Sequence, residues 1–179
     1  MQLTNVSGNS NTLTISGNTI VDTTDKLKIT NICFDTIKID SNTADISLTN
    51  LSSNGSIDIS KNNGDIYISG NINNIPTAKT SLTDITGDVS LSNISGTTNS
   101  LLNIDGGVSL SNISGTTNSL SNIDGGVSLS NISGTTNSLS NITGYVSLSN
   151  ISGNQLTMSN ILYYGDNLQG LSIWDFNVN

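Results

Sequence analysis

One segment returns nearly unchanged along this chain, and its repetition limits the available folds more than any other feature. VSLSNISGTTNSLSNID spans residues 108–124, and the copy at 127–143 differs only in its last residue. The valines that open successive copies are spaced by 19 residues: Val89, Val108, Val127 and Val146. A fixed period of this length indicates a repeat architecture, in which each unit buries its apolar face against its neighbours.

Each repeat has two similar halves, because L-S-N-I or a close variant occurs twice in it. The series has steps of 9 and 10 residues and runs through Leu91, Leu101, Leu110, Leu120, Leu129, Leu139, Leu148 and Met158. Residues 27–32 and 46–51 are also 19 positions apart and follow the same pattern, with more variation in residue type. The period slips at 16–26 and at 69–81, where Pro76, the only proline, is expected to lie in a loop.

The residue pattern inside each unit predicts strands rather than helices. V-x-L alternation places two apolar side chains on one face of a short strand and the serine on the other. The S-N pair that follows moves the next isoleucine out of this alternation, which indicates a corner. S-G-T-T-N-S and D-G-G have turn compositions. We therefore predict an all-β solenoid of about nine coils, with about 19 residues and two short strands in each.

The regularity of the repeat divides one continuous domain into three segments. Residues 1–81 are expected to form degenerate coils with irregular insertions, and residues 82–161 regular 19-residue repeats. Residues 162–179 are expected to form an aromatic C-terminal cap or an assembly strand, because terminal repeats need their open faces covered.

Identical residues in successive coils are expected to stack in columns. Two columns of asparagine are predicted, one through residues 93, 112, 131 and 150 with 31 and 50, the other through residues 103, 122, 141 and 160. Stacked amides can donate hydrogen bonds from coil to coil, whereas a charged residue would repel its own copies. The sequence thus predicts asparagine ladders and explains why charged residues make up only 10% of the chain.

Two stretches resemble known repeat architectures. The spacing L-x-x-I-x-x-x-V-x-L-x-x-I over residues 82–161 resembles a leucine-rich repeat. Residues 5–20, NVSGNSNTLTISGNTI, resemble the N-x-V-x-G β-roll of grass ice-binding proteins over one coil. The repeat asparagine falls two rather than three residues after the second leucine, and the two halves of each unit are nearly equivalent. These two departures from the leucine-rich repeat pattern favour a symmetric β-solenoid over a horseshoe of strands and helices.

Composition argues against several classes of partner. The net charge is −8, and from residue 80 onward there are six aspartates and no cation. Nucleic acids and anionic membrane surfaces both need clustered Lys or Arg. No apolar run approaches the roughly 20 residues of a spanning helix. The first residues have neither a basic region nor an apolar core, so no signal peptide is expected.

No catalytic, metal or cofactor site is predicted. Cys33 is the only cysteine and the chain has no histidine to activate it. Asp124-Gly125-Gly126 resembles part of the calcium-binding β-roll nonapeptide, but it lacks the G-G-x-G-x-D order and is expected to be a turn. The N-I-S sequons lie in the asparagine columns, where glycans would not fit at a spacing of about 4.8 Å.

These observations favour a structural protein that assembles with itself. We expect an extracellular filament or a virion surface, with head-to-tail contacts through Met1, Leu3, Val6 and Leu13 at one end and Tyr163, Tyr164, Trp174 and Phe176 at the other. The alternative is an adhesin-like or ice-binding module, with a surface receptor or glycan left open as a partner. Thr-Thr pairs such as Thr116-Thr117 suggest an ice-binding face, although adjacent threonines in a strand point in opposite directions.

Overall fold

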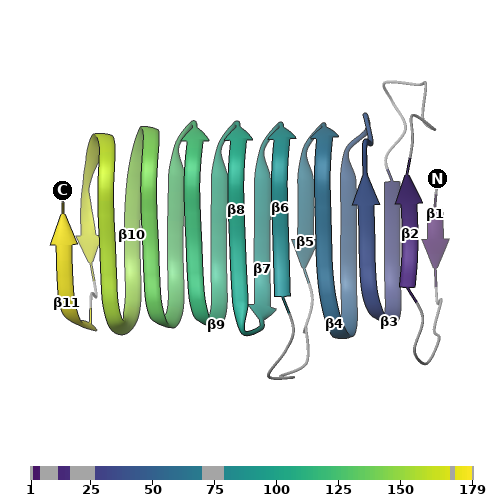
Figure 1. Cartoon of the computed structure of the whole chain (residues 1–179), viewed down its shortest axis with the longest axis horizontal. Helices are drawn as coiled ribbons and strands as arrows, with labels where there is room; N and C mark the ends of the chain where they lie inside the picture. Colours follow the sequence, from purple (N-terminus) through teal and green to yellow (C-terminus); the bar gives the residue numbers. More distant parts are fainter. Residues whose placement is uncertain (1, 5–11, 17–26, 70–78, 170–171, 179) are drawn as a thin grey trace.

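Alternating apolar and small polar residues form strands that wind as successive turns of one β-solenoid. The computed structural model describes residues 2–4, 12–16, 27–69, 79–169 and 172–178, and it describes side chains within 27–30, 36–49, 56–69 and 79–161. In these ranges the fold is all-β, and every strand pairing is parallel (Figure 1). The described residues include no helix of the length and apolarity needed to span a membrane.

The described residues form eleven strands in a single sheet system. They are β1 (Gln2–Thr4), β2 (Thr12–Ser16), β3 (Leu27–Asp40), β4 (Ile46–Asn63), β5 (Ile66–Ser69), β6 (Lys79–Thr86), β7 (Val89–Ser95), β8 (Thr98–Asp105), β9 (Val108–Asp124), β10 (Val127–Gln169) and β11 (Ser172–Val178). The two predicted strands of one coil are separate as β7 and β8. In β9 the same path is a single continuous strand.

Strand register confirms the 19-residue coil. Leu91 lies opposite Leu110, and Leu110 lies opposite Leu129. The described part of the chain forms about five turns of the solenoid at this spacing. The predicted total of nine coils stays a prediction. The spacing lengthens where the sequence period slips, since Ile66 pairs with Val89. Pro76 lies outside the described residues.

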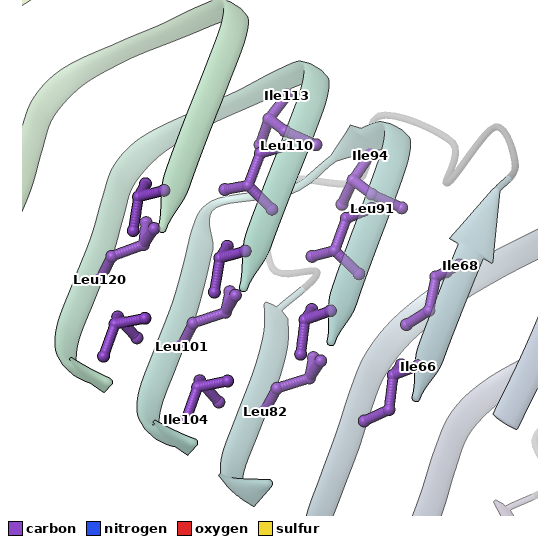
Figure 2. Packing of buried hydrophobic residues seen from close by; sticks show 14 of the residues in the cluster. Ile66, Ile68, Leu82, Leu91, Ile94, Leu101, Ile104, Leu110, Ile113 and Leu120 are labelled. Carbon is purple, nitrogen blue, oxygen red and sulfur yellow. The ribbon is translucent and has the colours of Figure 1, made fainter. Parts of the chain in front are cut away.

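The core is a set of apolar columns that run along the solenoid axis. In one coil Val108, Leu110, Ile113, Leu120 and Ile123 are all buried, and their counterparts in the neighbouring coils are buried with them. Figure 2 shows Leu110, Ile113 and Leu120, with counterparts in the neighbouring coils, projecting into the space between the two sides of each coil. No single coil encloses a core of this kind, so its stability depends on the coils above and below it.

The predicted corners are formed by asparagines in a left-handed backbone conformation. Asn112 has a φ of 55° and Asn122 a φ of 56°, and the equivalent asparagines of the neighbouring coils share this geometry. Asn tolerates this region better than most residues, because its short polar side chain hydrogen-bonds locally. The left-handed residue is exposed, and the isoleucine that follows it returns to the core. This geometry explains why S-N interrupts the alternation of the strand.

The symmetric solenoid predicted from the nearly equivalent halves of each repeat is confirmed over the described ranges. Both halves of each coil are strands, and both end in an asparagine corner. A horseshoe would require a helix in one half of each repeat, and the described halves contain none.

Candidate functional site

Two outer asparagine ladders lie on opposite corners of the solenoid, as predicted. In each ladder the Nδ2 atom donates to the Oδ1 atom of the asparagine 19 positions earlier, over 2.7–3.0 Å. Asn103, the first asparagine of the second ladder, donates to Asp84 Oδ1 over 2.8 Å. The side chains of Asn31 and Asn50, also assigned to a ladder, lie outside the described residues. The ladders tie the coils together at the points where the chain turns.

A third asparagine ladder lies inside the solenoid, at a place for which the sequence predicts only a turn. Asn99, Asn118 and Asn137 are 2–3% exposed. Asn99 Nδ2 donates to Asn118 Oδ1 over 2.8 Å, and Asn118 Nδ2 donates to Asn137 Oδ1 over 2.8 Å. This inner ladder runs in the opposite direction to the outer ladders. Its sequence signal is the asparagine of T-T-N-S, which recurs every 19 residues.

The inner ladder begins at an unsatisfied acceptor. Asn99 Oδ1 is buried and has no hydrogen-bond partner. The residue opposite Asn99 in the preceding coil is Thr80, which is also buried. Thr80 therefore occupies the rung from which an asparagine would donate to Asn99.

Each asparagine of the inner ladder packs against a glycine at the next corner. A Cβ atom at Gly134 would lie 2.5 Å from Asn118 Nδ2, and a Cβ atom at Gly115 would lie 2.8 Å from Asn99 Nδ2. Both distances are shorter than real Cβ contacts, so a larger residue would displace the amide. The S-G pair of each repeat is thus required by the buried amide, and not only by a turn.

One column of aspartates departs from the expectation that charged residues avoid stacking. Asp45, Asp65 and Asp88 occupy equivalent corners of successive coils. Asp65 N donates to Asp45 Oδ1 over 3.0 Å, Asp88 N to Asp65 Oδ1 over 2.9 Å, and Gly107 N to Asp88 Oδ1 over 2.8 Å. The amide donors offset repulsion between the carboxylates, because each carboxylate accepts a hydrogen bond from the next coil. Within the described ranges, no three Asp or Cys side chains lie close enough together to hold a metal ion.

Two exposed tyrosines that are far apart in the sequence line one surface groove. Tyr67 is 44% and Tyr145 is 42% exposed, and they are the exposed large hydrophobic residues among the described side chains. Between them lie Gly107, Gly126 and the serines of one column, Ser90, Ser109, Ser128 and Ser147, with Asp88 at the edge. The volume of this open groove is about 500 Å³. We refer to this surface as the tyrosine groove.

A second surface groove, the polar trough, is lined by three columns of repeat residues. They are the serine column Ser95, Ser114 and Ser133, the glycine column Gly96, Gly115, Gly134 and Gly153, and the column Thr97, Thr116, Thr135 and Asn154. Its volume is about 580 Å³. Only the first threonine of each Thr-Thr pair lines the trough, as expected when adjacent strand residues point to opposite faces.

Two of the four N-terminal residues predicted for assembly lie in edge strands. Leu3 is in β1 and Leu13 is in β2. Among the described residues both strands pair only with β3, so each has one open side. Met1 and Val6 lie outside the described residues.

The four C-terminal residues predicted for assembly lie in the last two strands. Trp174 and Phe176 are in β11, which pairs only with β10 within the described ranges. Tyr163 and Tyr164 are in β10. The described part of the structure does not include the side chains of these four residues, so their mutual contacts stay a prediction.

No family model matches the chain, and neither the curated proteins nor the solved structures give a match.

Proposed function

We propose that this chain is a structural β-solenoid that assembles head to tail into a fibre, a filament or a surface appendage of a cell or virion. The observation that supports the proposal most directly is the pair of open edges. β1 and β2 at one end and β11 at the other each pair on one side only, among the described residues. An open edge presents unpaired N–H and C=O groups to another chain.

The two edges are suited to each other because the whole sheet is parallel. A coil stacks on its neighbour by translation along the axis, as the pairing of Leu110 with Leu129 illustrates. The last strand of one copy can therefore pair with the first strand of the next in the same direction. A contact of this heterologous kind does not close on itself, and its repetition builds an open filament.

The monotony of the repeat also suits a spacer. Nearly identical coils allow the length of the rod to change by addition or loss of whole units, without a change in the ends. With nine coils, each rising about 4.8 Å, one subunit would be about 40 Å long. The filament is proposed to lie outside the cell or on a virion. The partner of each chain in it is another copy of the same chain.

Sedimentation velocity and electron microscopy of the purified protein test this proposal. The full chain should form filaments or a concentration-dependent series of oligomers, and deletion of residues 172–179 should reduce it to monomers. The matched control is deletion of residues 108–126, which removes one internal coil and leaves both ends intact, so assembly should persist. A stable monomer that is unaffected by the loss of residues 172–179 would contradict head-to-tail assembly.

A second candidate, a binding module, is favoured by one separate observation. The tyrosine groove places the two exposed aromatic side chains on one side of the rod, away from the strand edges used for stacking. Stacking through the edges and binding through the side of the rod can occur in the same molecule.

A further inference from the structure

The tyrosine groove has a chemical character that the rest of the described surface lacks. The repeat columns mainly present Ser, Thr and Asn to the solvent, whereas this groove has an aromatic ring near each end. Tyr67 and Tyr145 come from coils four steps apart, which corresponds to roughly 19 Å along the axis. Tyr67 is oriented by a weak hydrogen bond, in which its hydroxyl donates to Asp65 Oδ2 over 3.4 Å.

The floor between the tyrosines is flat because its residues are small. The residues equivalent to Tyr145 in the two preceding coils are Gly126 and Gly107. The residues equivalent to Tyr67 in the two following coils are Ser90 and Ser109. A ligand can therefore approach the backbone closely along the whole groove. The serine column offers one hydroxyl in each coil, and Asp88 adds a carboxylate that is fixed through its bond to Gly107 N.

This arrangement fits a polyhydroxylated chain better than a peptide or an anion. The backbone under the groove is already paired, since Val89 N donates to Gly107 O and Val108 N to Gly126 O, each over 2.8 Å. A peptide therefore finds no free strand edge on this face to extend. Among the described residues, Asp88 is the only charged one that lines the groove, and its negative charge disfavours an anionic ligand.

Sugar rings match the groove in both of their chemical aspects. The C–H face of a pyranose ring is apolar and packs against an aromatic ring, and tyrosine supplies a large, rigid contact of this kind at little entropic cost. The hydroxyl groups at the ring edges can bond to the serine column. They can also donate to Asp88, and a hydrogen bond to an ionised carboxylate is stronger than a neutral one.

We propose that the tyrosine groove binds a neutral polysaccharide chain that lies along the solenoid axis, with sugar rings stacked on Tyr67 and Tyr145 and hydroxyl groups bonded to Asp88 and the serine column. The site is separate from the strand edges. Glycan binding therefore does not require the proposed head-to-tail assembly. An experiment that contradicts one of these two proposals does not contradict the other.

Affinity electrophoresis in native gels tests the proposal with named probes. Soluble β-glucan, galactomannan and amylose are cast into separate gels, and insoluble cellulose and chitin are used in pull-down assays. The full chain should be retained by at least one of these neutral polysaccharides. Dextran sulfate serves as the anionic comparison and should not retain it.

Tyr67→Ser introduces the residue that Ser90 supplies at the equivalent position of the next coil. Tyr145→Ser introduces a residue slightly larger than Gly126, its counterpart in the preceding coil, where an added Cβ atom would make only an ordinary contact of 3.5 Å. Both variants are therefore expected to fold. Tyr67→Ser and Tyr145→Ser should each weaken retention by about tenfold or more, because each removes one of the two aromatic rings on which the sugar chain stacks. Tyr145→Phe keeps the ring and should retain most of the binding. Thr116→Ala in the polar trough is the control and should bind as the full chain does.

Three outcomes would overturn the proposal. The first is that no neutral polysaccharide retains the full chain. The second is that the variant with both serine substitutions binds as tightly as the full chain does. The third is that the double variant changes the sedimentation coefficient of the protein alone, which would identify the groove as a contact between copies.

Discussion

Asn118 is the middle rung of the inner ladder, and we expect Asn118→Ala to destabilise the solenoid markedly. The substitution removes the hydrogen bonds that join Asn118 to Asn99 and to Asn137. Asn137 Oδ1 is then left without its ladder donor, and Asn99 Nδ2 keeps only a long bond of 3.4 Å to Ser114 O. A buried polar group left unsatisfied, here Asn137 Oδ1, costs about 1–3 kcal/mol, and the hydrogen bond lost by Asn99 Nδ2 adds about 1 kcal/mol, so the expected loss is about 2–4 kcal/mol.

The matched control is Asn112→Gly in an outer ladder. Asn112 is exposed and also takes part in two ladder bonds, one as donor and one as acceptor. Water can replace both bonds, and glycine accepts the φ of 55° at this corner. The free energy of unfolding should therefore fall by no more than about 1 kcal/mol.

Guanidinium denaturation followed by circular dichroism compares the two variants with the full chain. Repeat proteins do not always unfold in one step, so the midpoints are compared together with amide hydrogen exchange in the coil that contains residue 118. Asn118→Ala should lower the midpoint far more than Asn112→Gly does. Equal midpoints for the two variants would refute the argument that burial makes the inner ladder the stronger one.

Three further predictions concern single side chains. Thr80→Asn should stabilise the protein by about 1 kcal/mol in denaturation, because the new amide can donate to the unsatisfied Asn99 Oδ1. Leu110→Ala should destabilise it by about 2–5 kcal/mol in the same assay, through a cavity in the core. Ser60 donates to Asp40 over 2.8 Å and lowers the pKa of that carboxyl from 3.8, so Ser60→Ala should raise this pKa in an NMR titration. The stability that this contact contributes is complete above pH 3.8 and is lost as pH falls through the folded pKa.

The sequence predicts the features that depend on the period alone. The spacing of Val89 and Val108 predicts the coil, the alternation of Val108 and Leu110 predicts the buried face, and the S-N pair predicts the corners with their outer ladders. All of these follow from how one residue stacks on its own copy.

The inner ladder and the tyrosine groove are not predicted, for two different physical reasons. T-T-N-S has the composition of a turn, and local propensity gives no sign that stacking can bury Asn118 with its hydrogen bonds satisfied. The sequence aligns residues 64–69 with residues 87–92, and the strand register confirms this alignment of Tyr67 with Ser90. The groove is missed because the glycines of D-G-G have the composition of a turn, and the sequence does not show that they leave an open surface between Tyr67 and Tyr145.

The central claim is that the regular coils are interchangeable units of 19 residues, and an internal deletion tests it most directly. Removal of residues 108–126 joins residue 107 to Val127, which then takes the place of Val108 in the register. Small-angle scattering should show a rod shorter by about 4.8 Å, with the β-type circular dichroism retained. Removal of residues 108–121, which is out of step with the period, should abolish the ordered rod. Loss of the β signal in the first deletion, or the same behaviour in both, would contradict the account.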